Sequence, residues 1–403
     1  MTDTEVHHDT EQAAAAAPSK TAMVFVGDRD SEGVIRQCFS DISLANAEFL
    51  NGGVNGAVAA LKARASPRLL IVDIQGADDP EARIRELANV CDPETGVVVI
   101  GDLNDIRIYR SLRASGVVEY YYKPLVRSLV LQTCQGILTG STEQAPSRDG
   151  KLVLVVSVRG GSGGTMIAAA TAWYLAETHK RRVGLIDLDL QYGDTALQLD
   201  VVPSHALKEA LDHPERVDEL FLERAVIHVG ERLGLMASLE PLTDLPAPSE
   251  AAVTSLLSLM LRRCRYVFVD IPPSLAPHLT SLLHLPCTVI LVSTGSLTSA
   301  RDVARWRKVI GPNSAEHTTL HILNKSGADE GLSNEEFASA VGTAPDIIIP
   351  FAREIATSSR LGMRGLQKCA ALQRGLVPLL RQLSGEGLAM AGRGRWWQFW
   401  SRA

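Results

Sequence analysis

The sequence predicts an α/β fold made of two doubly wound parallel-sheet domains, on three observations. Short apolar runs alternate with stretches of helical period along most of the chain, as in βα units on a parallel sheet. A polar segment rich in Gly, Ser and Pro interrupts this alternation at 139–150 and is expected to be a linker. The chain has 403 residues, more than one hydrophobic core normally serves.

Residues 21–138 are expected to form the first domain, after a disordered tail at 1–20 that has no hydrophobic period. The strands predicted from apolar runs are Met23–Val26, Leu69–Val72 and Val97–Ile100. The helices predicted from their period are Val54–Ala63 and Asp79–Asn89.

Residues 151–384 are expected to form the second domain, and 385–403 a tail rich in Arg and Trp. Continuous apolar runs, typical of strands covered on both faces, predict strands at Leu152–Ser157, Val183–Asp187, Tyr266–Asp270, Thr288–Ser293, Leu320–Leu323 and Ile347–Ile349. Helices are predicted at Thr165–Thr178, Glu250–Arg262, Ser299–Val309, Glu335–Val341 and Leu372–Leu383.

Composition narrows the possible partners and the compartment. The net charge of −6 provides no general attraction for nucleic acid, and the small cluster Arg262, Arg263 and Arg265 is explained as well by a solvated helix end. The six cysteines are scattered without zinc spacing, which predicts buried free thiols in a reducing compartment. No signal peptide or membrane-spanning run is visible, so we expect a cytoplasmic protein.

A phosphate-binding loop is expected where the strand Leu152–Ser157 meets an alanine-rich helix. The connecting residues are Arg159, Gly160, Gly161, Ser162, Gly163, Gly164 and Thr165. Glycines let a loop turn its N–H groups toward one point, and the helix N-terminus adds partial positive charge there. Thr165 lies where a P-loop hydroxyl would bind Mg²⁺. A glycine turn without a ligand is the alternative, and the acids that follow later strands weigh against it.

Acidic residues follow two further strands of this domain. Asp187, Asp189 and Asp194 come at or just after the strand Val183–Asp187, and Asp270 ends another strand. Ligands of open parallel sheets bind at the carboxyl ends of strands, where such an acid can hold Mg²⁺. Helix capping and turn formation are the alternative roles, which would suffice for Asp194.

The ordered set RGGSGGT, D-x-D at Asp187–Asp189, DIPP at Asp270 and LNKSG resembles the deviant-Walker ATPases of the ParA/MinD type. DLDLQYGDTALQLDV resembles especially the TadZ/CpaE branch, which positions the Tad/Flp pilus secretion machine at a cell pole. The resemblance implies ATP or ADP with Mg²⁺ as cofactors. It gives Asp189 the role of orienting attacking water, has Asp270 hold Mg²⁺ through water, and places Asn324 beside the adenine.

The resemblance also implies partners. They are a second copy in a homodimer, the Tad secretion ATPase and the inner-membrane platform of the pilus, which would bring the protein to the inner membrane at a cell pole. Nucleic acid is not an expected partner.

Two departures from the family pattern K-G-G-x-G-K-[ST] affect catalysis. Its first Lys, which reaches the nucleotide of the dimer partner, is Arg159 here, and its P-loop Lys is Gly164. Phosphoryl transfer depends on positioning and charge stabilisation, and Gly164 supplies no charge. We therefore expect nucleotide binding with weak or absent hydrolysis. The alternative is an active ParA/MinD-type ATPase that positions cargo on membrane or DNA.

The first domain resembles a receiver domain of response regulators, which has a flavodoxin-like fold. Asp73 ends the third strand and matches the phospho-acceptor, Lys123 matches the lysine after the fifth strand, and Asp28 one acid after the first strand. The neighbouring acid is missing, and Gly101 stands where a switching Ser or Thr is usual. We expect an unphosphorylated docking or dimerisation domain; the alternative is a response regulator controlled by phosphorylation of Asp73.

The C-terminal tail concentrates aromatic residues in a chain that has few of them. The large aromatics Trp396, Trp397, Phe399 and Trp400 are flanked by arginines. Trp favours membrane interfaces and protein hot spots, and Arg complements anionic lipid, so a peripheral membrane contact or a partner contact is expected. A tail that folds back over its own domain is the equal alternative.

Overall fold

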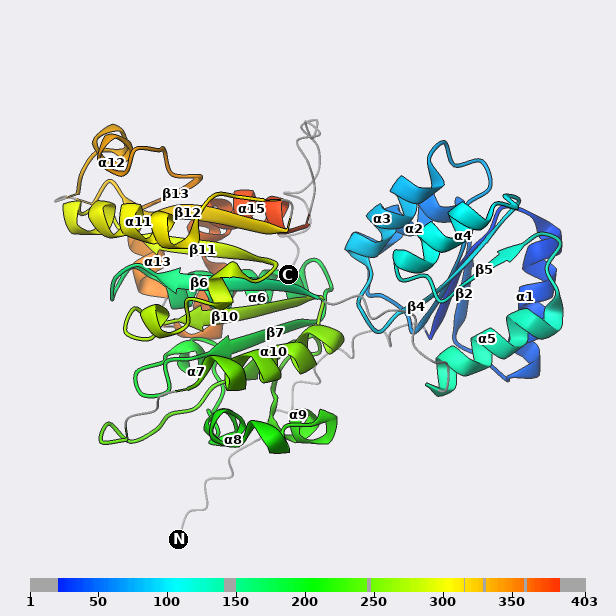
Figure 1. The fold of residues 1–403 in the computed structure, drawn as a ribbon, viewed down its shortest axis with the longest axis horizontal. Helices are drawn as coiled ribbons and strands as arrows, with labels where there is room; N and C mark the ends of the chain where they lie inside the picture. The colour runs from blue at the N-terminus through cyan, green and yellow to red at the C-terminus, as the bar shows by residue number, and fades with distance from the viewer. Residues whose placement is uncertain are drawn as a thin grey trace, which may run out of the picture.

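The structure is a computed structural model that describes residues 21–140, 150–244, 248–314, 316–328, 331–358 and 361–384. It contains a five-stranded and an eight-stranded sheet, each with helices on both faces (Figure 1). Two α/β units confirm the predicted fold class. The exact domain limits stay predictions. None of the helices described is long and apolar enough to span a bilayer.

The five-stranded sheet is entirely parallel and has the order β2-β1-β3-β4-β5. This is the flavodoxin-like order expected for a receiver domain. The strands are β1 (Ala22–Phe25), β2 (Ala47–Leu50), β3 (Leu69–Asp73), β4 (Gly96–Gly101) and β5 (Glu119–Tyr122). The residues predicted for the receiver-like site, Asp28, Asp73 and Lys123, lie at or just after the carboxyl ends of these strands.

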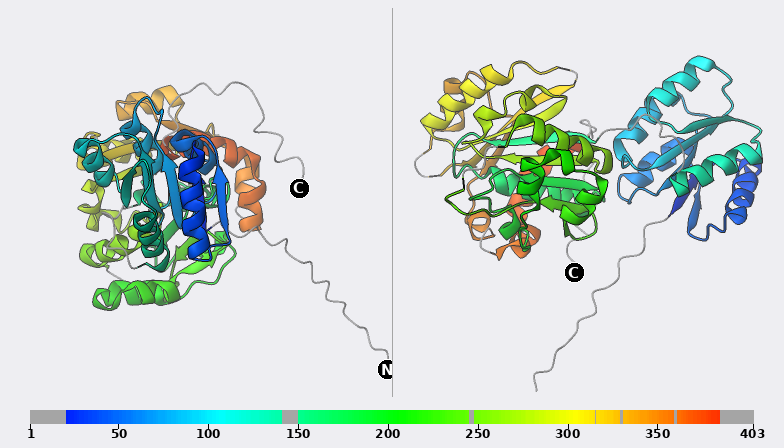
Figure 2. Two further views of the ribbon diagram at one scale, coloured as in Figure 1. Left: turned by 90° about the vertical axis from the view of Figure 1, so that its right-hand side faces the viewer. Right: turned by 60° about the horizontal axis from the view of Figure 1, so that its bottom comes forward.

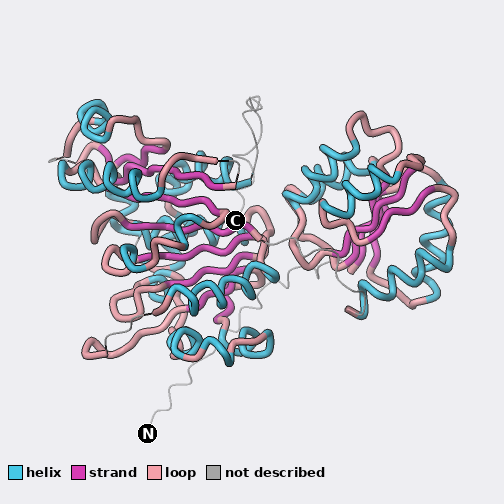
Figure 3. The backbone as a smooth tube through the Cα atoms, viewed as in Figure 1, coloured by secondary structure: helices cyan, strands magenta, loops and turns pink. Residues whose placement is uncertain are grey.

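Helices α1 (Arg29–Asp41) and α5 (Arg127–Thr139) pack on one face of this sheet, where Val24, Ile35 and Val130 are buried together. The other face is covered by α2 (Gly53–Leu61), α3 (Pro80–Val90) and α4 (Ile106–Ala114). Figure 3 shows this layering as helices on either side of the strands.

The eight-stranded sheet has the order β13-β12-β11-β6-β10-β7-β9-β8. Its strands are β6 (Lys151–Ser157), β7 (Val183–Asp187), β8 (Ile227–Val229), β9 (Leu233–Met236), β10 (Tyr266–Ile271), β11 (Cys287–Ser293), β12 (His317–Ser326) and β13 (Ile347–Pro350). The sheet is parallel, as predicted, except at one edge, where β8 pairs antiparallel with β9. The two are joined by a turn too short for the crossover that parallel strands require.

Helices cover both faces of the eight-stranded sheet. One face carries α6 (Gly164–Glu177), α7 (Thr195–Gln198), α13 (Arg353–Ser358), α14 (Met363–Lys368) and α15 (Ala370–Ser384). The other carries α8 (Ala206–Asp212), α9 (Glu219–Ala225), α10 (Glu250–Arg263), α11 (Leu297–Ile310) and α12 (Asn334–Val341). The central strand β6 lies between β11 and β10, so the loop after β6 sits at the middle of the sheet edge.

Arginines near the starts of β7 and β10 contact residues of the first domain. Figure 2 gives two further views of both sheets and their helices. The Arg182 N–H donates to Asp92 Oδ1 at 3.3 Å, and Arg265 Nη2 donates to Asn89 Oδ1 at 3.3 Å. Arg263 Nε lies 3.8 Å from Glu94 Oε1. Two members of the basic cluster therefore contact polar groups of the first domain, which corrects the interpretation of that cluster as only a solvated helix end.

Five of the six cysteines are buried and Cys264 is half-buried, and none of the six forms a disulfide. The expectation of buried thiols therefore holds for all but Cys264.

Candidate functional site

The loop between β6 and α6 has the backbone of an anion-binding turn. Gly161 and Gly163 have φ of +76° and +90°, which side-chain-bearing residues rarely adopt. Gly163 is the N-cap of α6, with no side-chain cap hydrogen bond. The free N–H groups of the first helical turn therefore remain for a ligand, together with the positive end of the helix dipole.

Gly164 lies tightly against Ser157, the last residue of β6. A Cβ placed on Gly164 would lie 2.1 Å from Ser157 Oγ and 3.3 Å from Ser157 Cβ. Any side chain at position 164 therefore requires Ser157 to move. The packing around Gly164 therefore leaves no room for a P-loop lysine unless Ser157 moves.

The end of β12 contacts this loop from the neighbouring side. Asn324 is buried, and its Nδ2 donates to Ser162 O at 2.8 Å. Lys325 Nζ donates to Gly161 O at 2.7 Å. The prediction that Asn324 lies beside an adenine stays a prediction. Its contact with the phosphate loop was not foreseen, and neither was any role for Lys325.

Two buried carboxyl groups end β7 and β10 behind the loop. Asp187 and Asp270 are 2% and 3% exposed. Burial raises the pKa of Asp187 to about 6, against opposing hydrogen bonds from Thr195 and Asp189. Burial and then the charge of Asp187 raise the pKa of Asp270 well above its ordinary value, while a hydrogen bond from Thr165 lowers it in part. An added cation would relieve both effects.

Asp189 and Asp194 lie beside this pair, in the segment that joins β7 to α7. The N–H of Tyr192 donates to Asp189 Oδ1 at 3.0 Å, so this carboxylate is held in the turn after β7. Asp194 precedes α7 but makes no capping hydrogen bond through its side chain. Asp187 Oδ2 instead accepts from Thr195 N at 3.3 Å. Asp194 is thus the N-cap residue of α7 by position, but the side-chain oxygen that accepts from the first turn belongs to Asp187.

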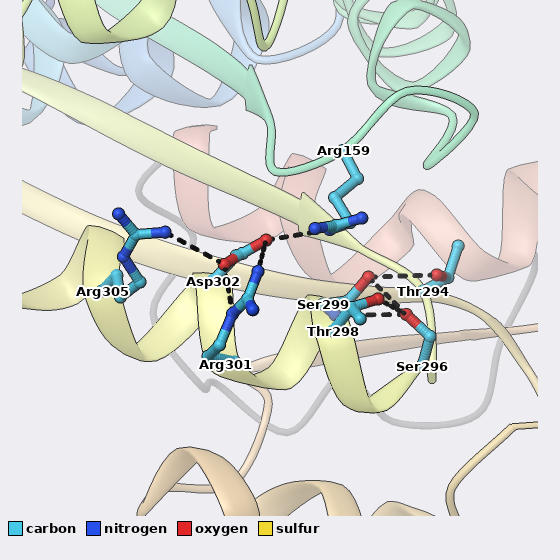
Figure 4. Close-up of polar contacts among 8 residues, drawn as sticks. All are labelled: Arg159, Thr294, Ser296, Thr298, Ser299, Arg301, Asp302 and Arg305. Carbon is cyan, nitrogen blue, oxygen red and sulfur yellow. Dashed lines mark hydrogen bonds and ion pairs between the residues drawn. The ribbon is translucent and has the colours of Figure 1, made fainter.

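Arg159 is engaged within its own chain. Its Nε lies 2.8 Å from Asp302 Oδ2 on α11. Arg301 binds both oxygens of the same carboxylate, and Arg305 binds Oδ1 (Figure 4). Hydrogen bonding from Arg301 holds the pKa of Asp302 at about 2, with a further contribution from Arg159. The side chain expected to reach a dimer partner is thus paired with Asp302.

The residues at this edge fit a magnesium-bound polyphosphate. Ser162 Oγ is buried and has no hydrogen-bond partner within the described part of the chain. Across those same ranges, no three His, Cys, Asp or Glu side chains are grouped so as to hold a metal ion by themselves. A cation here would therefore take oxygens from Thr165, water and the phosphates, with Asp270 acting through water.

The receiver-like site is built around one ammonium group. Lys123 Nζ lies 2.6 Å from Asp73 Oδ2, 2.7 Å from Asp28 Oδ2 and 2.7 Å from Gln75 Oε1. Burial opposes the charged form, yet the hydrogen bonds that Lys123 donates to Asp28 and Asp73 hold the pKa of Lys123 above its ordinary value. The structure thus brings the three predicted residues together, and Gln75 is an addition. The tail residues Trp396, Trp397 and Trp400 lie outside the described residues.

Comparison with known proteins adds to this geometry. No protein-family model and no curated protein matches the chain. Among solved structures, a ParA family ATPase from Chlorobium tepidum is 22% identical, with a TM-score of 0.51, over 58% of this chain and 98% of that chain. This likeness shows that the larger unit has the ParA fold. The MinD cell division ATPase of Pyrococcus furiosus is 17% identical, with a TM-score of 0.46, over 59% of this chain and 99% of that chain.

A second kind of match is shorter and closer in sequence. The pilus assembly protein CpaE from Caulobacter crescentus is 33% identical over 29% of this chain and 91% of that chain, with a TM-score of 0.27. The matched extent fits the length of the five-stranded domain. On this sequence identity over nearly the whole of that relative, together with the ParA fold of the larger unit, the chain belongs to the CpaE family of pilus assembly proteins.

Proposed function

We propose that this chain binds ATP or ADP with Mg²⁺ at the loop after β6 and acts as a placement scaffold in the assembly of a Tad/Flp pilus. The observation that carries the proposal is the edge at which the glycine loop, the start of α6 and the buried Asp187–Asp270 pair converge. Backbone N–H groups and one divalent cation would bind the phosphates there.

Hydrolysis is proposed to be weak or absent. Gly164 cannot place a charge on the transferring phosphoryl group, and Arg159 is paired with Asp302. Asp189 would still orient water, but positioning without charge stabilisation accelerates phosphoryl transfer little. The nucleotide would then act as a ligand that stabilises one conformation or assembly of the protein.

The partners proposed are a second copy of this chain, the Tad secretion ATPase and the inner-membrane platform of the pilus. The protein would work in the cytoplasm and at the inner membrane of a cell pole. The aromatic tail would provide the peripheral contact there.

Phosphate release by the purified protein tests the catalytic half of the proposal. We expect turnover at the background rate, unchanged by anionic vesicles, by DNA or by Asp189→Ala. Turnover clearly above background that Asp189→Ala abolishes would establish the alternative, an active ParA/MinD-type ATPase.

The receiver-like domain is proposed to dock partners or to self-associate without phosphorylation. The site has only Asp28 and Asp73, one acid fewer than a magnesium-dependent acceptor site uses, and Lys123 pairs with both of them. Incubation with acetyl phosphate and Mg²⁺, followed by mass spectrometry, tests this. We expect no phosphate on Asp73, and robust labelling that Asp73→Asn removes would make the chain a response regulator.

A further inference from the structure

Gly164 leaves the phosphate loop without the positive charge that a P-loop lysine normally brings. The first helical turn provides only partial charge through its N–H groups. Arg159, the nearest cation in sequence, has its Nε 2.8 Å from Asp302 Oδ2. A polyphosphate in this loop therefore needs a cation from another segment if its charge is to be neutralised beyond Mg²⁺.

Lys325 lies on that loop although it is 164 residues from Gly161 in sequence. Its Nζ donates to Gly161 O at 2.7 Å, and the side chain is exposed. An ammonium group has three N–H donors, so this contact leaves donors for phosphate oxygens. Lysine binds phosphate as a compact point charge on a flexible stem.

The backbone around Lys325 is shaped for this placement. Lys325 has a φ of +57°, which is uncommon for a residue other than Gly. The pairing of β12 with β13 shifts register between Asn324 and Ser326, so Lys325 occupies a bulge. Bulges redirect side chains next to functional sites, and such conformations concentrate there.

Asn324 holds this bulge against the loop. Its Oδ1 accepts from the Lys325 N–H at 2.9 Å while its Nδ2 donates to Ser162 O at 2.8 Å. The end of β12 is therefore fixed to two successive carbonyls of the phosphate loop, those of Gly161 and Ser162. Lys325 is therefore held on the phosphate loop itself.

We propose that Lys325 supplies, from the bulge after β12, the phosphate-binding charge that Gly164 cannot supply from α6. The inference rests on the proposed nucleotide binding and names a binding residue for the same site. It predicts that the contribution of Lys325 grows with the number of phosphates on the ligand.

The test compares affinities of the full-length protein for ATP, ADP and adenosine in the presence of Mg²⁺, measured by calorimetric titration. Lys325→Met keeps most of the side-chain length and removes the charge. We expect it to weaken ATP binding about tenfold or more, ADP binding less, and adenosine binding not at all. Lys325→Arg keeps the charge and should retain most of the ATP affinity.

Lys308→Met is the matched control. Lys308 lies in the last turn of α11, a helix that starts near the carboxyl edge of the sheet and runs away from it, and its loss should leave all three affinities unchanged. Thermal unfolding of each variant without ligand reports whether it folds as the wild type does.

Two results would overturn the role of Lys325 alone. One is wild-type ATP binding that Lys325→Met leaves intact, and the other is an equal loss for ATP and adenosine, which would make Lys325 a structural clamp of the loop. A wild-type protein that binds none of the three ligands would instead overturn the proposed function, and this inference with it.

Discussion

The two sheets carry acidic residues at the same topological place but balance their charge in opposite ways. In the five-stranded domain, Asp28 and Asp73 share one lysine, Lys123, at 2.7 and 2.6 Å. In the eight-stranded domain, no lysine among the described residues forms an ion pair with the buried acids Asp187 and Asp270, and burial raises the pKa of both. The first site contains its own cation, while the second fits an added one.

A fold can therefore keep the sheet edge at which its relatives bind a ligand whether or not that ligand is still bound. Lys123 fills the space between the receiver-like acids, which favours a stable docking surface over magnesium chemistry. Without a cation, the Asp187–Asp270 pair lowers the stability of the folded protein, because two groups of like charge are buried together. The second edge is therefore the one where ligand binding should change the protein most.

The largest effect should follow removal of the internal cation by Lys123→Met. Asp73 is only 4% exposed and would lose its partner. Removing one partner of a buried pair costs roughly 3–5 kcal/mol, and the partial exposure of Asp28 reduces this to about 2–3 kcal/mol of unfolding free energy. Calorimetric unfolding of the full-length protein measures the loss.

Lys62→Met is the control for that variant. Lys62 lies 3.3 Å from Glu86, and both side chains are well exposed, so it should cost less than about 0.5 kcal/mol. A Lys123→Met protein as stable as this control would contradict the account of the receiver-like site.

The next largest effect is expected from Asp270→Asn, which should act in opposite directions on stability and on binding. Without ligand, removing a buried like charge should raise the unfolding temperature at neutral pH. With Mg²⁺, the affinity for ATP should fall about tenfold, or about 1.4 kcal/mol. Asp194→Asn removes an exposed charge that raises the pKa of Asp270 less than the charge of Asp187 does, so it should have a much smaller effect on both. If Asp270→Asn lowered the stability of the ligand-free protein, repulsion between the carboxyl groups of Asp187 and Asp270 would not be destabilising.

A smaller effect is expected from pH. The folded pKa of Asp187 is about 6, above its unfolded value, so its contribution to stability is complete below about pH 4 and is lost as pH rises through about 6. Asp187→Asn should flatten this part of the profile of unfolding temperature against pH, and so should saturating Mg²⁺ with nucleotide. If the unfolding temperatures of the wild type and of Asp187→Asn changed equally between pH 4 and pH 7, titration of Asp187 would not contribute to the pH dependence of stability.

The smallest effect is expected from Asp302→Asn. The Arg159 side chain is 45% exposed, and exposed ion pairs contribute about 0–1 kcal/mol. Stability should change by no more than that, while Arg159 becomes free to contact a second copy. Sedimentation with Mg²⁺ and ATP measures whether the dimer fraction increases; an unchanged fraction would show that the pairing with Asp302 does not limit self-association.

The features that could be predicted from the sequence are those that depend on a local pattern of residues. The apolar run before the glycines fixed the place of β6 and α6, and the acids Asp187 and Asp270 could be assigned to strand ends. Lys123, Asp73 and Asp28 followed from their order along the chain. Each of these signals lies within a few residues of the element that it identifies.

The features that were missed depend on contacts between distant segments. The edge strand β8 spans only Ile227–Val229, too few residues to show a period. The contacts of Arg159 with Asp302 and of Lys325 with Gly161 join segments 143 and 164 residues apart. No local pattern encodes them, although a lysine next to Asn324 in LNKSG was available as a signal.

The proposed function requires that the edge with the buried acids Asp187 and Asp270 bind a magnesium-bound nucleotide without a P-loop lysine. Calorimetric titration of the wild-type protein with ATP, with Mg²⁺ and again with the metal chelated, tests it most directly. We predict saturable binding that weakens markedly when Mg²⁺ is removed. Absence of binding to ATP and to ADP at millimolar ligand, with the protein folded, would contradict it.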